Sequence, residues 1–164
     1  MIIYLKNKDT LQVDSFKFKC CIGKNGLSKN KIEGDYKTPM GLFNLGHLYF
    51  RKNKSKELNS NLKKILIKKN MGWCNDINNK KKYNKLIKSN NKIRHEKLFR
   101  KDYKYDLLIP IEYNYYKPIP GKGSCIFIHL TNNYKHTAGC IALKKKDFLI
   151  MSMLLNRKNK IKIS

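Results

Sequence analysis

One segment decides the fold and carries the chemistry. It consists of an apolar run, a polar loop and a second run: Gly123-Ser124-Cys125-Ile126-Phe127-Ile128-His129-Leu130, then His136-Thr137-Ala138-Gly139-Cys140-Ile141-Ala142-Leu143. The first run is short, rich in β-branched and aromatic residues and preceded by glycine, which favours a buried strand over a helix. Side chains alternate between the two faces of a strand, so His129 shares a face with Cys125 and Phe127. We expect a nearby loop to bring Cys140 to His129.

Cys140 and His129 together predict a thiol acyl-transfer site. A free thiol has a pKa of about 8.5, so at neutral pH it reacts poorly unless an imidazole accepts its proton. His129 is the expected base, and its imidazolium can then protonate the departing amine. Gly139 permits a tight turn that aims backbone N–H groups at a developing oxyanion, and Thr137 belongs to the same loop. Attack on the thioester by an amine or by water distinguishes a transferase from a hydrolase, and both remain open.

The rest of the chain predicts a mainly β domain. Strand-like runs separated by turn residues occupy 2–5, 11–22, 36–50, 105–113, 124–130 and 161–163. A helical segment is expected near 56–69 and another over 144–156, with a polar, loop-prone stretch after Trp73. At 164 residues the chain has the length of one domain, and we predict a single catalytic domain over 1–164.

Composition is dominated by a formal net charge of +26, which would ordinarily suggest a polyanionic partner. The 37 basic residues comprise 33 Lys and only 4 Arg, however, alongside 19 Asn and 18 Ile. Arginine is the residue whose planar fork recognises phosphates and bases, and it is scarce here. The lysines are spread along the chain, so we interpret them as a solvated surface and expect no specific nucleic-acid partner. A basic polyanion-binding module is the alternative.

The five cysteines form no C-x-x-C pair, so spacing predicts neither a disulfide framework nor a zinc finger. We assign Cys20, Cys21 and Cys125 to packing, because each lies in an apolar run and cysteine is often buried. His136 and Cys140 could supply only two of the four ligands of a structural zinc site. We therefore expect no metal and no cofactor, and a monomeric protein.

The N-terminal residues begin at once with a strand-like run. They lack the basic and apolar regions of a secretory signal peptide. No apolar stretch approaches the roughly 18 residues of a membrane-spanning helix, so no membrane span is expected.

The active-site loop resembles that of a known family, the YkuD-type L,D-transpeptidases. Thr137, Gly139 and Cys140 match the family's signature, and His129 matches its upstream general base. The segment Thr38-Pro39-Met40-Gly41-Leu42-Phe43 resembles a second family motif. The resemblance implies a β-sandwich with a helical insertion and a C-terminal helix. It also implies action on peptidoglycan stem peptides in the cell envelope or periplasm, whereas the lack of a visible signal peptide favours the cytoplasm.

Two residues depart from the family pattern. Ala138 stands where a second His is usual, and Ala142 stands where Arg or Asn commonly follows the cysteine. A branch of the family with a Thr-Ala-Gly-Cys loop is more similar, since it also has the Trp-Cys-x-Asp and His-Glu segments found here. That similarity implies substrate binding by Trp73, Asn75, Asp76, His95 and Glu96, and His136, four residues before Cys140, is a further candidate to position a substrate carboxylate. Core packing for Trp73, an exposed loop position for His136 and a surface role for the His95-Glu96 pair are the alternatives.

The sequence thus predicts a cysteine-dependent L,D-transpeptidase that works through a thioester. An L,D-carboxypeptidase, or another amide hydrolase using the same cysteine and histidine, is the first alternative.

Overall fold

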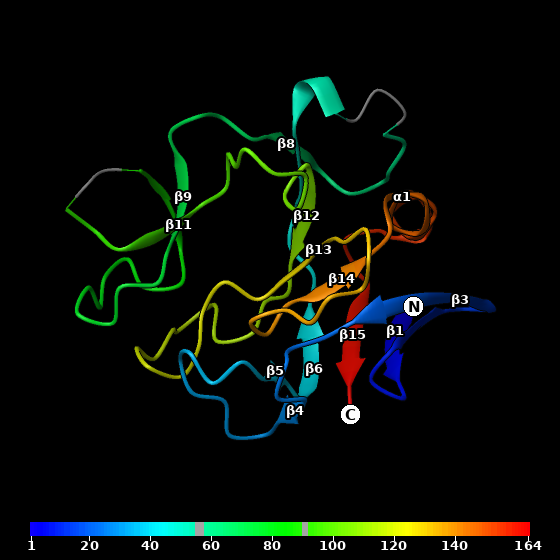
Figure 1. Ribbon diagram of the computed structural model, residues 1–164, viewed down its shortest axis with the longest axis horizontal. Helices are drawn as coiled ribbons and strands as arrows, with labels where there is room; N and C mark the ends of the chain where they lie inside the picture. The colour runs from blue at the N-terminus through cyan, green and yellow to red at the C-terminus, as the bar shows by residue number, and fades with distance from the viewer. Residues whose placement is uncertain (55–57, 90–91) are drawn as a thin grey trace.

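The computed structural model describes residues 1–54, 58–89 and 92–164 (Figure 1). Strands dominate it, as predicted, and the helix near the C-terminus forms where it was expected. The strands are β1 (Ile2–Lys6), β2 (Thr10–Val13), β3 (Phe16–Cys21), β4 (Leu27–Ser28), β5 (Thr38–Pro39), β6 (Gly41–Asn44), β7 (Leu48–Phe50), β8 (Lys64–Leu66), β9 (Met71–Cys74), β10 (Leu86–Lys88), β11 (His95–Lys97), β12 (Leu107–Pro110), β13 (Phe127–Leu130), β14 (Ile141–Leu143) and β15 (Lys160–Ile163). The helices are the 3-10 turn η1 (Lys52–Lys54) and α1 (Lys145–Leu154).

Within the described residues, ten strands form one curled sheet in the order β6-β15-β1-β2-β3-β14-β13-β12-β7-β8. The two sides of this sheet meet, because an isolated bridge joins Leu45, just after β6, to Ile111, just after β12. Backbone hydrogen bonds from Glu112 to Asn44 (2.9 Å) and from Gly46 to Pro110 (2.8 Å) reinforce the junction. The curl gives the sheet an inner face and an outer face, which fits the predicted sandwich.

The two faces of β13 and β14 have different roles. These strands are parallel neighbours, with Ile128 paired to Ile141 and His129 paired to Ala142. Because side chains alternate along each strand, Ile128 and Ile141 enter the larger hydrophobic core. Phe127 and Cys140 enter a second cluster on the opposite face. The predicted alternation around His129 is therefore confirmed, and it places the cysteine on the histidine's side of the sheet.

The larger core lies between the curled sheet and α1. Phe148 and Met151 on α1 are fully buried, and they belong to the same cluster as Ile3, Leu11 and Ile161 of the sheet. Burial of such side chains contributes about 1.5–3 kcal/mol each, so this layer is a main source of stability. No helix in the described residues is long and apolar enough to cross a membrane.

The insertion after β7 differs from the prediction. The helical segment predicted near 56–69 is wrong over the described residues 58–69, which instead contain β8 paired in parallel with β7. Residues 56 and 57 lie outside the described residues. The physical reason is local: asparagine and serine at 59–61 are poor helix formers, and Ser60 Oγ accepts the N–H of Leu62 in a turn (3.2 Å). Residues 64–66 then pair with the free edge of β7 and form β8.

The stretch after Trp73 is also more ordered than predicted. It forms a three-stranded sheet in the order β10-β9-β11, which stands beside the main sheet in Figure 1. Only β9 of this sheet is largely buried. The other two strands therefore need no regular alternation of apolar and polar side chains. The short, lysine-rich β10 and β11 therefore resemble loop in sequence although their backbones pair with β9.

Two predicted strands are interrupted in the structure. The run 11–22 is divided into β2 and β3 by a hairpin turn in which Asp14 adopts a left-handed φ of +54°. The run 36–50 is divided into β5, β6 and β7. The runs predicted at 2–5, 105–113, 124–130 and 161–163 contain β1, β12, β13 and β15, with boundaries shifted by a few residues.

The packing of α1 can be tested by truncation. Phe148→Ala should lower the free energy of unfolding by about 3–5 kcal/mol, because it leaves a cavity in the larger core. Met153→Ala on the exposed side of the same helix, where the side chain is 49% exposed, should change it by no more than about 0.5 kcal/mol. Urea unfolding followed by the fluorescence of Trp73 measures both. Equal losses for the two variants would contradict this placement of α1.

Candidate active site

His129 and Cys140 line the same pocket, a cavity of about 280 Å³. His129 is at the penultimate position of β13, and Cys140 immediately precedes β14. Both are largely enclosed, with exposed fractions of 7% and 8%. His129 pairs with Ala142 across the two strands, so Cys140, two residues earlier on the same face, is its diagonal neighbour. The strand pairing therefore brings a thiol and an imidazole to one cavity.

The Cys140 thiol is held by two backbone groups. Its Sγ accepts a hydrogen bond from the Phe127 N–H (3.4 Å), and its S–H donates to the carbonyl oxygen of Cys125 (3.2 Å). Burial, and to a smaller extent the nearby Glu96 carboxylate, raises the pKa of the thiol to about 12. The Phe127 N–H and the Lys31 ammonium act in the opposite direction. At rest the thiol is therefore protonated.

The His129 imidazole is oriented by its own strand. Nδ1 lies 2.9 Å from the Leu130 carbonyl oxygen. A carbonyl can only accept, so Nδ1 carries the proton and Nε2 keeps its lone pair. Burial, with smaller contributions from the Lys104 and Arg100 charges, lowers the pKa of His129 to about 4. The ring also packs edge-on against Tyr105, with centroids 5.3 Å apart. The imidazole is thus neutral at physiological pH and in the tautomer that a base requires.

The Thr137 side chain forms hydrogen bonds within the loop that carries Cys140. Its hydroxyl donates to the Cys140 carbonyl oxygen (2.6 Å) and accepts the N–H of Gly139 (3.1 Å). Its backbone is clamped as well, because its N–H donates to the Ile22 carbonyl (3.0 Å) and its carbonyl accepts the Lys24 N–H (3.0 Å). These bonds fix the loop against the end of β3.

Gly139 is required where the loop meets the segment before β5. Its φ is +141°, and a Cβ at this position would lie 2.8 Å from the Lys37 carbonyl oxygen. Its own carbonyl accepts the Thr38 hydroxyl (2.8 Å). Any side chain here would push the two segments apart. Thr38, from the motif that resembles the family's second segment, therefore supports the cysteine loop directly.

A polar network forms one wall of the cavity. The Tyr105 hydroxyl donates to Glu96 Oε1, and the Arg100 guanidinium lies 3.8 Å from the same oxygen and 5.0 Å from the centre of the Tyr105 ring. Burial raises the pKa of Glu96, whose side chain is 28% exposed. The cavity also contacts Lys104, Lys135 and His136. It therefore offers one carboxylate among several cationic groups.

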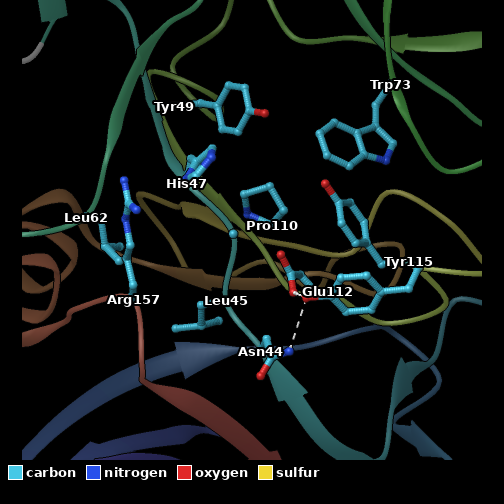
Figure 2. A pocket seen from close by; sticks show the side chains of 12 residues that line it. Asn44, Leu45, His47, Tyr49, Leu62, Trp73, Pro110, Glu112, Tyr115 and Arg157 are labelled. Atoms are coloured by element: carbon cyan, nitrogen blue, oxygen red, sulfur yellow. Dashed lines mark hydrogen bonds between the residues drawn. The ribbon is translucent and has the colours of Figure 1, made fainter.

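Among the residues predicted for substrate binding, Glu96 and His136 line the cavity with Cys140. Trp73 does not, and the core alternative applies to it: it is 2% exposed, packs edge-on against Phe127, and donates from Nε1 to Asn84 Oδ1 (2.9 Å). It lines a second cavity of about 300 Å³ that contains neither Cys140 nor His129. Figure 2 shows Trp73 there with Tyr49, Tyr115 and Glu112.

The other three predicted residues, Asn75, Asp76 and His95, lie in the insertion and line neither cavity. Asp76 caps a turn by accepting the Asn78 N–H (3.0 Å). The His95 ring lies between Ser89 Oγ (2.7 Å) and the Ile93 carbonyl (2.6 Å). A Cβ on Gly72 would lie only 2.5 Å from this ring. These contacts give Asp76 and His95 roles in the fold of the insertion.

Three residues near the site were not predicted: Arg100, Tyr105 and Lys31. Tyr105 was expected only as the start of a buried run, and Arg100 had no pattern beyond being one of four arginines. Lys31 was one lysine among 33, although its spacing of four residues from Asp35, across a glycine turn, was a usable signal. Among the described residues, no group of three or more His, Cys, Asp or Glu side chains is arranged to hold a metal ion.

The curled sheet, and a pocket shared by a strand-end histidine and a loop cysteine, define a mainly β domain with a Cys-His site. Comparison with protein families identifies it further: residues 1–163 match the L,D-transpeptidase catalytic domain, YkuD. The chain belongs to this family. No curated protein and no solved structure matched it.

The depressed pKa of His129 predicts a pH dependence of stability. The unfolded state, with an ordinary histidine pKa of about 6.5, binds a proton before the folded state does, so stability falls as pH falls from 6.5 towards 4. The loss attributable to His129 between pH 7 and pH 5 is about 2 kcal/mol. Urea unfolding of the wild type and of His129→Gln at both pH values isolates it. An identical pH dependence for the two proteins would contradict the burial of a neutral His129.

Proposed function

We propose that the protein is a cysteine-dependent L,D-transpeptidase that acts on peptidoglycan stem peptides through a thioester. The observation that carries the proposal is the shared cavity, which is lined by both Cys140 and His129, together with the Nδ1 contact to the Leu130 carbonyl, which leaves Nε2 of His129 unprotonated. Membership of the L,D-transpeptidase catalytic domain family supplies the substrate class.

The first chemical step is the transfer of the thiol proton. Cys140 leaves its hydrogen bond to the Cys125 carbonyl, turns towards His129, and attacks the carbonyl carbon of the donor peptide bond as Nε2 accepts the proton. Catalytic hydrogen bonds are commonly long in the unliganded enzyme and tighten when substrate binds, so a change of one side-chain torsion at Cys140 is consistent with this role. The C–S bond forms as the carbonyl π bond opens to an oxyanion.

The loop around Cys140 supplies the oxyanion donors in this proposal. The expected donors are the backbone N–H groups of Cys140 and Gly139. The Gly139 N–H donates to Thr137 Oγ1 at rest, so it must exchange this partner for the oxyanion. Collapse of the oxyanion expels the amine, which takes the proton from the His129 imidazolium. The acyl group then passes to an amine of a second stem peptide, and Nε2 accepts the proton of that attacking amine. The C–S bond breaks, and the His129 imidazolium returns the proton to the departing Cys140 thiolate.

The charges of the cavity suit a stem peptide. Such peptides carry free carboxylates and an ammonium group, and the wall provides Arg100, Lys104 and Lys135 for the former and Glu96 for the latter. Ala142 lies beside His129 and is small, which leaves room for substrate where a longer side chain would project. Consistent with its family, we propose that the protein acts in the cell envelope.

Acylation of the cysteine is the direct test. Incubation with a stem tetrapeptide donor should add the mass of the tripeptide acyl group to the protein, and peptide mapping should locate it at Cys140. Cys140→Ala should remove the adduct entirely, whereas Cys20→Ala, which removes another buried thiol, should keep it.

The products separate the alternatives. Dimeric stems in the presence of an acceptor amine support a transpeptidase, whereas tripeptide alone would favour an L,D-carboxypeptidase. An adduct that persists in Cys140→Ala would contradict the proposed nucleophile. Tight binding to nucleic acid at physiological salt, with no adduct in the wild type, would favour the polyanion-binding alternative.

A further inference from the structure

A buried lysine lies next to the loop that carries Cys140. The side chain of Lys31 is 3% exposed, and its Nζ lies 2.6 Å from Asp35 Oδ1 and 3.4 Å from the Ile32 carbonyl oxygen. Lysine is among the residue types least often buried, because its ammonium loses hydration when it leaves water. In a chain with a largely solvated set of lysines, an enclosed one calls for a physical explanation.

The position of this side chain depends on two glycines of the active-site region. A Cβ on Gly123 would lie 2.9 Å from Lys31 Cε, and a Cβ on Gly139 would lie 3.5 Å from Lys31 Nζ. The aliphatic part of Lys31 therefore runs along Gly123, and its ammonium reaches the backbone immediately before Cys140. Both glycines have positive φ, +101° and +141°, so side chains at these positions would be strained as well as obstructive.

Asp35 holds the lysine in place. While Oδ1 contacts Lys31, the same carboxylate accepts the N–H groups of Ile32 and Lys37, each at 2.9 Å. The turn that includes Gly34 thus builds a fixed seat for the ammonium. A methionine of similar length could fill the space without the cost of desolvating a charge, so packing alone does not explain a lysine here.

Several ionisable groups among the described residues influence or adjoin the Cys140 thiol. Glu96 opposes formation of the thiolate. The Cys125 thiol and the Tyr105 phenol also interact electrostatically with Cys140. His129 is neutral. Lys31 is the cation that opposes the effect of Glu96 on Cys140. The two charges approach the nucleophile from different segments, since Glu96 is on β11 and Lys31 precedes β5.

We infer that Lys31, seated by Asp35, is a positioning residue whose ammonium stabilises the Cys140 thiolate through the Gly139 backbone region. This inference rests on the proposed function only in taking Cys140 as the nucleophile. It assigns the 31–35 turn a part in the chemistry, although the turn does not line the cavity. The competing explanation is purely structural: the ion pair would serve only to fix the turn.

The two explanations predict different signs for two substitutions. Lys31→Met removes the cation and keeps most of the volume, so the thiolate should become less stable. Asp35→Asn removes the counter-charge and leaves the cation, so the thiolate should become more stable. If the pair is purely structural, both variants lose the same ion pair and should affect Cys140 in the same direction.

The measurement is the rate at which iodoacetamide alkylates Cys140, followed by peptide mapping at several pH values. The rate should fall about tenfold in Lys31→Met, because a neighbouring charge shifts a pKa by about one unit or more. It should rise severalfold in Asp35→Asn, and Lys31→Arg should recover most of the wild-type rate. Lys24→Met, which removes an exposed cation next to the Thr137 carbonyl, should change the rate by less than about twofold, because exposed charges are screened.

Several outcomes would overturn the inference. One is a wild-type alkylation rate in Lys31→Met, and another is slower alkylation in both Lys31→Met and Asp35→Asn. If Lys31→Met does not fold, the direction of the change in Asp35→Asn decides between the explanations. Alkylation needs no peptide substrate, so these results stand even if the stem-peptide donor leaves no adduct. That second failure would count against the proposed function alone.

Discussion

The parallel pairing of β13 with β14 is the interaction on which the rest of the site depends. Ile128 and Ile141, paired across the two strands, are both fully buried in the larger core. A shift of one residue in either strand would place a polar or small side chain in that core and would turn the histidine or the cysteine away from the cavity. The apolar side chains on the inner face therefore fix the register that positions His129 and Cys140 on the outer face.

Burial makes the Cys140 thiol a weaker acid and the His129 imidazole a weaker base than the free groups. Burial raises the pKa of Cys140 to about 12 and lowers that of His129 to about 4, so both groups are neutral at rest. A standing thiolate-imidazolium pair is not the favoured state of the unliganded site. Proton transfer must therefore accompany attack on a bound carbonyl, where the oxyanion and the new C–S bond stabilise the charge that develops.

The sequence was most informative where chemistry and strand periodicity coincide. The alternation from Cys125 to Leu130 predicted the face of His129, and glycine beside cysteine predicted a tight loop. Prediction failed in the insertion, where helix and strand propensities are both weak and the free edge of β7 decides the outcome. The positions of Trp73 and His95 outside the Cys140 cavity could not be predicted either, because their contacts with Asn84 and Ser89 are tertiary and no local pattern specifies them.

The account is tested most directly by the pH dependence of Cys140 acylation with a stem tetrapeptide, in the wild type and in His129→Gln. If His129 is a base that stays neutral above its pKa of about 4, the wild-type rate should be nearly constant between pH 5.5 and 8. In His129→Gln only the preformed thiolate can react, so the rate should be far lower and should rise about tenfold per pH unit. A wild-type rate that also rises about tenfold per pH unit over this range would contradict the account, because His129 would then make no contribution as a base.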